Sequence, residues 1–153
     1  MKKLLIPLIL LLPLAGCAIA PNRGAFTDTA KMANSGTEFP GQATVYFFRD
    51  PAAGLGGRTM HLIMDGVPVA GLFNATYVVF PAAPGDHKLL VDWGSRWMGA
   101  TRGLEISTSL EKDKTYYFGF STSIGFNSVN EAAFQIDAAG AQTREKTYTK
   151  ATP

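Results

Sequence analysis

The chain has 153 residues, with 14 lysines and arginines against 12 aspartates and glutamates, and it contains one cysteine. This length is that of a single domain. The lone cysteine excludes an intramolecular disulfide. Nucleic-acid binding is not expected, because no basic run interleaves with aromatic residues.

The first 16 residues have the composition of a signal peptide. Lys2 and Lys3 give a positive start, and residues 4–12 are aliphatic apart from Pro7. Because this run is shorter than the roughly 20 apolar residues that span a bilayer, we interpret it as a signal segment and exclude it from the fold. Removing both lysines leaves 12 basic and 12 acidic residues in a mature chain that is nearly neutral.

The signal segment ends in a sequence similar to the lipobox of bacterial lipoproteins, formed by Leu14, Ala15, Gly16 and Cys17. The resemblance implies recognition by lipoprotein signal peptidase, a diacylglyceryl thioether on Cys17, and an acyl chain such as palmitate on the new amine. Several acyl chains hold a protein firmly in the membrane, since each buried CH2 group contributes about 0.8 kcal/mol. The alternative is a free thiol beside an unrelated cleavage site. Ala18, where aspartate would resemble an inner-membrane signal, favours the outer membrane, facing the periplasm.

Residues 17–42 are expected to be the lipidated N-terminus and a flexible tether. Apolar residues are sparse there, so the segment buries little surface to offset its ordering entropy. A short helix at 29–33 is the one element considered within it.

Residues 43–150 are expected to form a β-domain. Ala43–Arg49 is dense in β-branched and aromatic residues, as in a strand packed on both faces. Asp65-Gly66 predicts a hairpin turn, and a break is expected from Pro81 to Asp86. Tyr116 and Tyr117 should point to opposite faces of their strand. The other strands are expected at residues 59–64, 67–73, 75–80, 87–93, 104–110 and 115–121.

The C-terminal part leaves two alternatives. Residues 131–137 and 144–148 can pair as strands across 138–143, or a helix can begin at Glu131. Strand is favoured at 131–137 because Ala132, Phe134 and Ile136 recur at every second residue. Seven or eight short strands with regular turns predict an all-β fold, a small antiparallel β-sandwich or a partly open barrel.

Four motifs in this order look like a domain-of-unknown-function family found in bacterial lipoproteins. They are Thr-Val-Tyr-Phe-Phe-Arg at 44–49, Met-Asp-Gly-Val at 64–67, Pro-Gly-Asp-His-Lys-Leu at 84–89 and Lys-Thr-Tyr-Tyr-Phe at 114–118. Residues 84–87 are also similar to the turn-strand signature of PEGA-type β-domains. The resemblance covers about residues 43–137. It implies a compact β fold in the cell envelope and supplies no activity, cofactor or catalytic residue.

The two histidines, His61 and His87, are the only candidates for metal or general-base chemistry. The aspartates that can join them are Asp50, Asp65, Asp86 and Asp92. The chain has no ligand spacing such as His-Glu-x-x-His, and no Gly-x-Ser-x-Gly motif. Structural or solvent-facing histidines are therefore favoured, and no metal, cofactor or enzymatic activity is expected.

The segment 93–102 is the candidate interaction loop, because large apolar residues sit there among glycines and arginines. Exposed residues of these kinds mark contact surfaces. Its residues are Trp93, Arg96, Trp97, Met98 and Arg102. The alternative is that Trp97 folds back and caps the open end of the sandwich.

Together these observations predict a lipid-anchored, periplasm-facing β-domain with a structural or protein-interaction role in the envelope. Its partners would be the membrane, through Cys17, and an envelope protein or peptidoglycan. A second hypothesis is a glycan-binding module that stacks sugars on Trp97, Trp93 or Tyr116. A third, disfavoured one is a hydrolase or metalloprotein that uses His61 and His87.

Overall fold

The structure is a computed structural model that describes residues 22–25, 34–35, 37–54, 57–93, 103–125 and 129–153. Its elements are β1 (Asn22–Ala25), β2 (Asn34–Ser35), β3 (Ala43–Arg49), β4 (Met60–Met64), β5 (Val67–Leu72), β6 (Thr76–Ala82), β7 (Gly85–Asp92), β8 (Leu104–Leu110), β9 (Lys114–Ile124), β10 (Val129–Gln135), α2 (Ala138–Thr147) and β11 (Thr149–Lys150).

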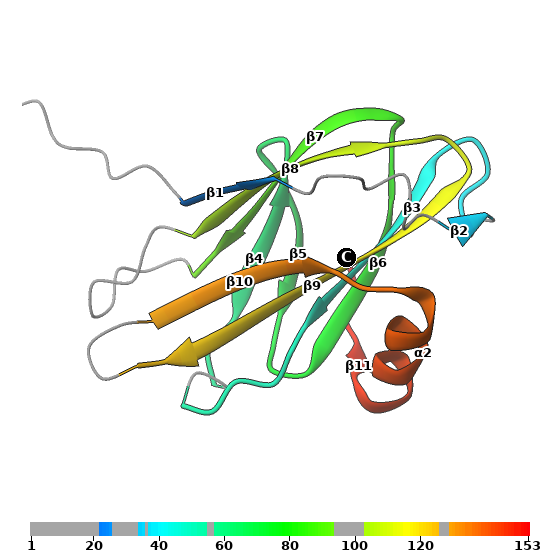
Figure 1. Cartoon of the computed structure of the whole chain (residues 1–153). Helices are drawn as coiled ribbons and strands as arrows, with labels where there is room; N and C mark the ends of the chain where they lie inside the picture. The colour runs from blue at the N-terminus through cyan, green and yellow to red at the C-terminus, as the bar shows by residue number, and fades with distance from the viewer. Residues whose placement is uncertain (1–21, 26–33, 36, 55–56, 94–102, 126–128) are drawn as a thin grey trace, which may run out of the picture.

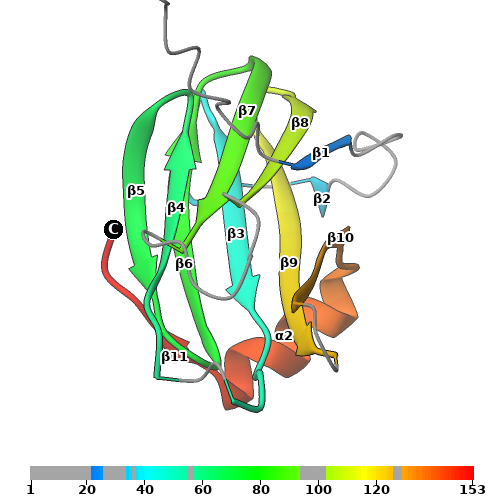
Figure 2. The same cartoon turned by 90° about the vertical axis from the view of Figure 1, so that its left-hand side faces the viewer.

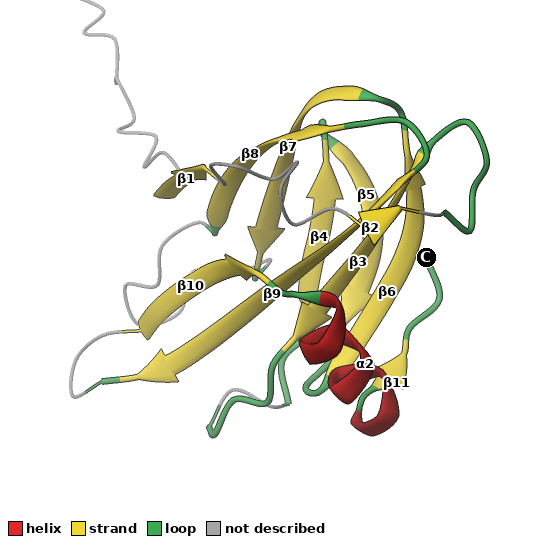
Figure 3. Cartoon of the chain, turned by 45° about the vertical axis from the view of Figure 1, so that its right-hand side comes forward, coloured by secondary structure: helices red, strands yellow, loops and turns green. Residues whose placement is uncertain are grey.

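The strands form two sheets packed face to face, with α2 on the outer side of one of them (Figures 1 and 3). One sheet has the order β1-β8-β7-β4-β5. The other has the order β10-β9-β3-β6-β11, and β2 also pairs with β9. Neither sheet closes into a barrel within the described residues. The predicted β-sandwich is confirmed, and β3 to β10 are its eight longer strands.

The sheets are mixed rather than purely antiparallel. β3 runs parallel to β9, with Phe47 opposite Phe118, and antiparallel to β6. After β3 the chain forms β4 and β5 in the other sheet, adds β6 beside β3, and then forms β7 and β8 in the other sheet before it returns in β9. This parallel pair is therefore not joined by a single helical crossover. β1 and β8 are also parallel, as are β6 and β11.

The main core lies between the two sheets, and Figure 2 views them with the β4-containing sheet in front. Along β3 the side chains alternate, so Val45 and Phe47 enter this core while Tyr46 and Phe48 point to the outer face. Both faces of β3 are therefore packed, as predicted from its composition. The largest fully buried side chains of the main core are Tyr116, Phe47, Phe118, Phe120, Met60, Leu62, Leu72, Leu89 and Ile106.

The β4–β5 hairpin follows the turn chemistry of the sequence. Asp65 and Gly66 have φ of 50° and 83°, so both residues of the β4–β5 turn are left-handed, as this dipeptide predicts. The break expected at 81–86 is shorter, because β6 continues through Pro81 to Ala82. β11 reaches only Thr76 and Tyr77, so Pro81 lies where β6 is a sheet edge, and proline is tolerated there.

The strand predicted at 144–148 is wrong, because residues 138–147 form helix α2. The segment lacks alternating apolar residues, and Asp137 caps the helix by accepting a hydrogen bond from the Gly140 N–H at 2.7 Å. The strand preferred at 131–137 is confirmed as β10. Among the described residues no helix has the length and apolarity needed to cross a membrane.

Two parts of the predicted tether extend the sheets. β1 pairs with β8, and β2 pairs with β9 at Thr115 and Lys114. The tether prediction rested on how little side-chain surface the segment can bury, whereas an open sheet edge binds a passing backbone whatever its side chains. The helix considered at 29–33 lies outside the described residues.

Gly119 of β9 lets an aromatic ring lie against the strand. It sits opposite Phe134 of β10. A Cβ at this position would be 2.6 Å from the Phe134 Cζ and 2.9 Å from the Ile136 Cδ1. The missing side chain is therefore filled by the side chains of the neighbouring strand and of the segment that leads into α2.

We predict that Gly119→Ala destabilises the domain by about 1–3 kcal/mol, because the added methyl must displace a packed ring. The free energy of unfolding from urea denaturation measures this. Gly57→Ala is the control, since a Cβ there meets nothing within 4 Å. It should change stability by less than about 0.5 kcal/mol. Equal stability of the two variants would contradict the packing described here.

Candidate functional site

Three tyrosines from three neighbouring strands gather on the outer face of the β9-β3-β6 part of the sheet. Tyr46 of β3 lies opposite Tyr117 of β9, and Tyr77 of β6 lies opposite Phe48. The ring centroids of Tyr46 and Tyr117 are 4.9 Å apart, and those of Tyr46 and Tyr77 are 6.4 Å apart. All three side chains are only partly buried. We call Tyr46, Tyr77 and Tyr117 the tyrosine surface.

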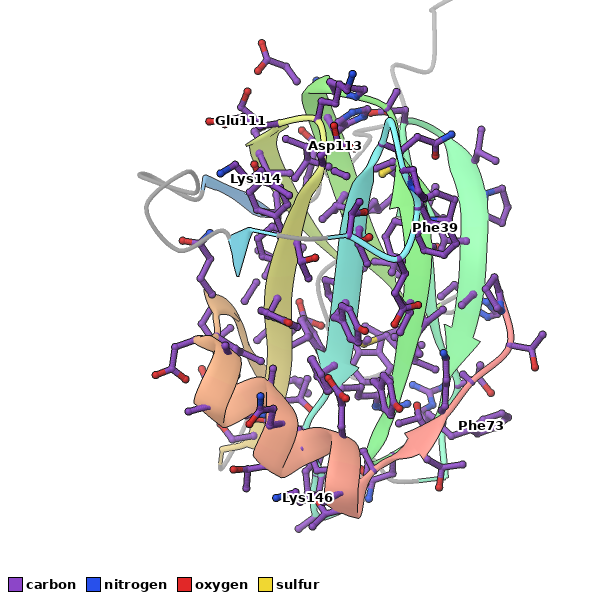
Figure 4. All side chains as sticks on the ribbon, turned by 90° about the vertical axis from the view of Figure 1, so that its right-hand side faces the viewer. Phe39, Phe73, Glu111, Asp113, Lys114 and Lys146 are labelled. Atoms are coloured by element: carbon purple, nitrogen blue, oxygen red, sulfur yellow. The ribbon has the colours of Figure 1, made fainter. Side chains whose placement is uncertain are left out.

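The tyrosine surface lies between the segment 37–42 and helix α2. Figure 4 looks onto this face, with the segment that carries Phe39 crossing above and α2, marked by Lys146, crossing below. The Thr44 hydroxyl ties the segment to β3, since it accepts from the Glu38 N–H at 3.0 Å and bonds the Thr37 hydroxyl at 2.6 Å. This arrangement places Glu38 beside the tyrosines.

Two carboxylates act on the tyrosine surface, that of Glu38 from the segment 37–42 and that of Glu145 from α2. Glu38 accepts a hydrogen bond from the Tyr46 hydroxyl at 2.5 Å. Burial raises the pKa of Tyr46, and so do this hydrogen bond and the charges of Glu38 and Glu145. Burial also raises the pKa of Glu145, and the negative charge of Glu38 adds to that shift. The negative charges of the two carboxylates therefore repel each other.

An ion pair holds α2 against the sheet and so fixes the lower border of the tyrosine surface. Arg144 donates to both carboxylate oxygens of Asp50, at 2.9 and 3.2 Å, in the bidentate geometry that favours strong pairing. The Tyr148 hydroxyl donates to the same carboxylate at 2.8 Å. Burial, and then this hydrogen bond, raise the pKa of Tyr148 to about 12. Arg144 also lies 5.7 Å from the Phe134 ring centroid.

The two histidines lie apart and cannot form one site. His61 of β4 lies opposite Asp92 of β7. His87 is five residues before Asp92 on β7, so the two histidines are about 16 Å apart along the sheet. An odd spacing puts them on opposite faces of the sheet. Among the described residues no group of three or more histidine, cysteine, aspartate or glutamate side chains is arranged to hold a metal ion.

His87 instead stabilises the turn before β5. Its Nδ1 lies 2.6 Å from Asp65 Oδ2, and its Nε2 lies 2.7 Å from the Ala83 carbonyl oxygen. Hydrogen bonds from the Lys88 N–H, and then from His87, lower the pKa of Asp65. Partial burial lowers the pKa of His87. The hydrogen bonds to Asp65 and Ala83 and the negative charges of Asp65 and Asp86 raise it and outweigh burial, so the net shift of this pKa is upward.

Trp93 belongs to the core rather than to an exposed loop. Its side chain is 7% exposed, and the Arg49 guanidinium lies 5.0 Å from the ring centroid. The Trp93 indole N–H donates to the Glu131 carboxylate. Arg49 is itself buried, donates to the Leu72 carbonyl oxygen at 2.7 Å, and has its pKa lowered by burial. The predicted contact role of Trp93 is therefore wrong.

Tyr116 is also unavailable as a stacking platform. It is 1% exposed, and its hydroxyl accepts from the Glu111 N–H at 2.8 Å. The other predicted site residues, in the signal segment and in the candidate loop, lie outside the described residues. They are Leu14, Ala15, Gly16, Cys17, Arg96, Trp97, Met98 and Arg102.

Sequence reasoning assigned no site role to Tyr46, Tyr77 or Glu145. The available signal was the alternation in residues 43–49 and 115–121, which puts aromatic side chains on a second face of each strand. One of Tyr116 and Tyr117 was expected to face solvent or a second layer, without a choice between them, and Tyr117 is the one that lies on the outer face. The sequence carried no signal that α2 would bring Glu145 to the same place.

We predict that the Asp65–His87 pair stabilises the fold most between roughly pH 4 and 6.5, the ordinary pKa values of the two groups. Its contribution is lost as pH rises through the raised pKa of His87, and as pH falls through the lowered pKa of Asp65. Asp65→Asn keeps a residue that tolerates a positive φ but removes the charge. Urea denaturation should give a larger loss of stability for this variant at pH 5 than at pH 9.

Asp113→Asn is the matched control. Asp113 is also a turn residue with a positive φ, and it accepts from the Gly41 N–H at 2.7 Å rather than pairing with a histidine. Its loss of stability should be the same at pH 5 and pH 9. A pH-independent loss for Asp65→Asn would refute the role assigned to the pair.

No protein-family model matches this chain, and no curated protein sequence matches it either.

Proposed function

We propose that the chain is a lipid-anchored, periplasm-facing domain without catalytic activity, which binds another protein of the cell envelope through the tyrosine surface. The anchor is the expected lipid on Cys17, and the outer membrane is the expected location. The observation that carries the binding role is the set of three partly exposed tyrosines on one sheet face.

Tyrosine suits an interface because it combines a large apolar ring with a polar hydroxyl. Aromatic residues are enriched at protein interfaces and at their energetic centres. The tyrosine surface is also held in place before any partner arrives. Tyr46 donates a hydrogen bond to Glu38, and the Arg144–Asp50 ion pair holds α2 against the sheet. Less side-chain entropy would therefore be lost on binding.

A glycan partner is the second candidate, because tyrosine rings can also stack on sugars. The burial of Trp93 and Tyr116 removes two of the three platforms considered for it from the sequence. The tyrosine surface would replace them, so the same position tests both candidates.

A photo-crosslinking amino acid at position 117, introduced into the full chain in living cells, should give a discrete crosslinked band. Val67, an apolar residue of β5 that is 65% exposed, is the matched control position on the other sheet. It should give no such band. A smear that peptidoglycan hydrolase collapses would identify a glycan instead, and no product at position 117 would contradict the binding role.

The substitution Cys17→Ser tests the lipid anchor, by palmitate labelling and by the crosslink at position 117. This change removes the thiol that lipidation requires, so the chain should no longer incorporate labelled palmitate. The band at position 117 should also disappear, because the domain is no longer held at the membrane. Palmitate incorporation that persists in Cys17→Ser would overturn the assignment of the anchor.

A further inference from the structure

We propose that the tyrosine surface binds a cationic side chain, a lysine or arginine, presented by the partner protein. This inference rests on the proposed function and adds the chemistry of the partner. It follows from the aromatic rings of the tyrosine surface and from the charges that the fold places near them.

The aromatic part favours a cation. Tyr46, Tyr77 and Tyr117 are contiguous through Tyr46, with one pair stacked at 12° and the other tilted at 47°. The face of an aromatic ring carries negative electrostatic potential, and lysine and arginine bind over such faces within about 6 Å of the centroid. Within the part of the chain that the structure describes, Arg49 over Trp93 and Arg144 over Phe134 are contacts of this kind.

The flanking charges favour a cation as well. Glu38 accepts a hydrogen bond from Tyr46, and Glu145 lies in α2. After burial, the negative charges of both carboxylates raise the pKa of Tyr46 and of Tyr77. Lys150 acts on Glu145 and offsets part of this negative charge. A cation bound between the carboxylates would relieve their repulsion, whereas an anionic partner would add to it.

The partner's cation would make contacts that are individually weak, so a high affinity needs further contacts around it. A single exposed ion pair or ring contact changes affinity by about two- to fivefold. The removal of one carboxylate and one ring together should therefore weaken binding by about tenfold. This size is measurable with a short peptide.

The probe is a capped Gly-Lys-Gly-Lys-Gly peptide, titrated into the mature lipidated chain in non-ionic detergent and followed by NMR chemical shifts. The peptide should bind, and its counterpart with acetylated lysines should bind at least about fivefold more weakly. Glu145→Gln should lower the affinity about two- to fivefold. Tyr117→Leu should do the same, while Tyr117→Phe, which keeps the ring, should retain it.

Glu111→Gln is the matched control, because Glu111 is an exposed carboxylate in the turn between β8 and β9. It should leave the affinity unchanged. No binding, equal binding of the acetylated peptide, or equal effects of Glu145→Gln and Glu111→Gln would each overturn the inference. A crosslink at position 117 together with any of these results would leave the proposed function standing and reject only a cationic partner.

Discussion

The parallel pairing of β3 with β9 is the constraint on which the rest of the structure depends. Both strands carry large side chains on their two faces, with Phe47 and Phe118 on one side and Tyr46 and Tyr117 on the other. Both faces of this strand pair must therefore be covered by other elements. The β4-containing sheet covers the inner face, and α2 with the segment 37–42 covers the outer face (Figures 1 and 4).

Among the described residues, α2 and the segment 37–42 cover the outer face only in part, and the partly exposed tyrosines there form the candidate site. α2 buries Ala141 against Phe48 and Ile136, but the three tyrosines beyond it stay partly exposed. The helix is held by one bidentate ion pair rather than by a broad apolar face. The same elements that cover the sheet also bring Glu38 and Glu145 to the rings. The elements that cover the second face of the sheet therefore also form the candidate site.

The sequence predicts the strands well, because an alternation of period two is a local property. It identifies residues 43–49, 104–110 and the Asp65-Gly66 turn. It fails where the answer depends on distant partners. Residues 144–148 were assigned to a strand although Asp137 caps a helix there. Trp93 was expected at the end of the strand 87–93 but was also counted with the candidate interaction loop, although Arg49 and Glu131 hold it in the core. No local pattern reveals that the charge of Glu145 acts on Tyr46.

The proposed binding role requires that the tyrosine surface is open in the isolated domain and covered in the cell envelope. Hydroxyl-radical footprinting with mass spectrometry tests it directly, on the purified mature chain in detergent and on isolated envelopes. We expect Tyr46, Tyr77 and Tyr117 to be oxidised in detergent and protected in envelopes. Buried Tyr116 should stay protected in both, and Phe73, which is 55% exposed, should stay reactive in both. Equal oxidation of the three tyrosines in both samples would contradict the proposed binding role of the tyrosine surface.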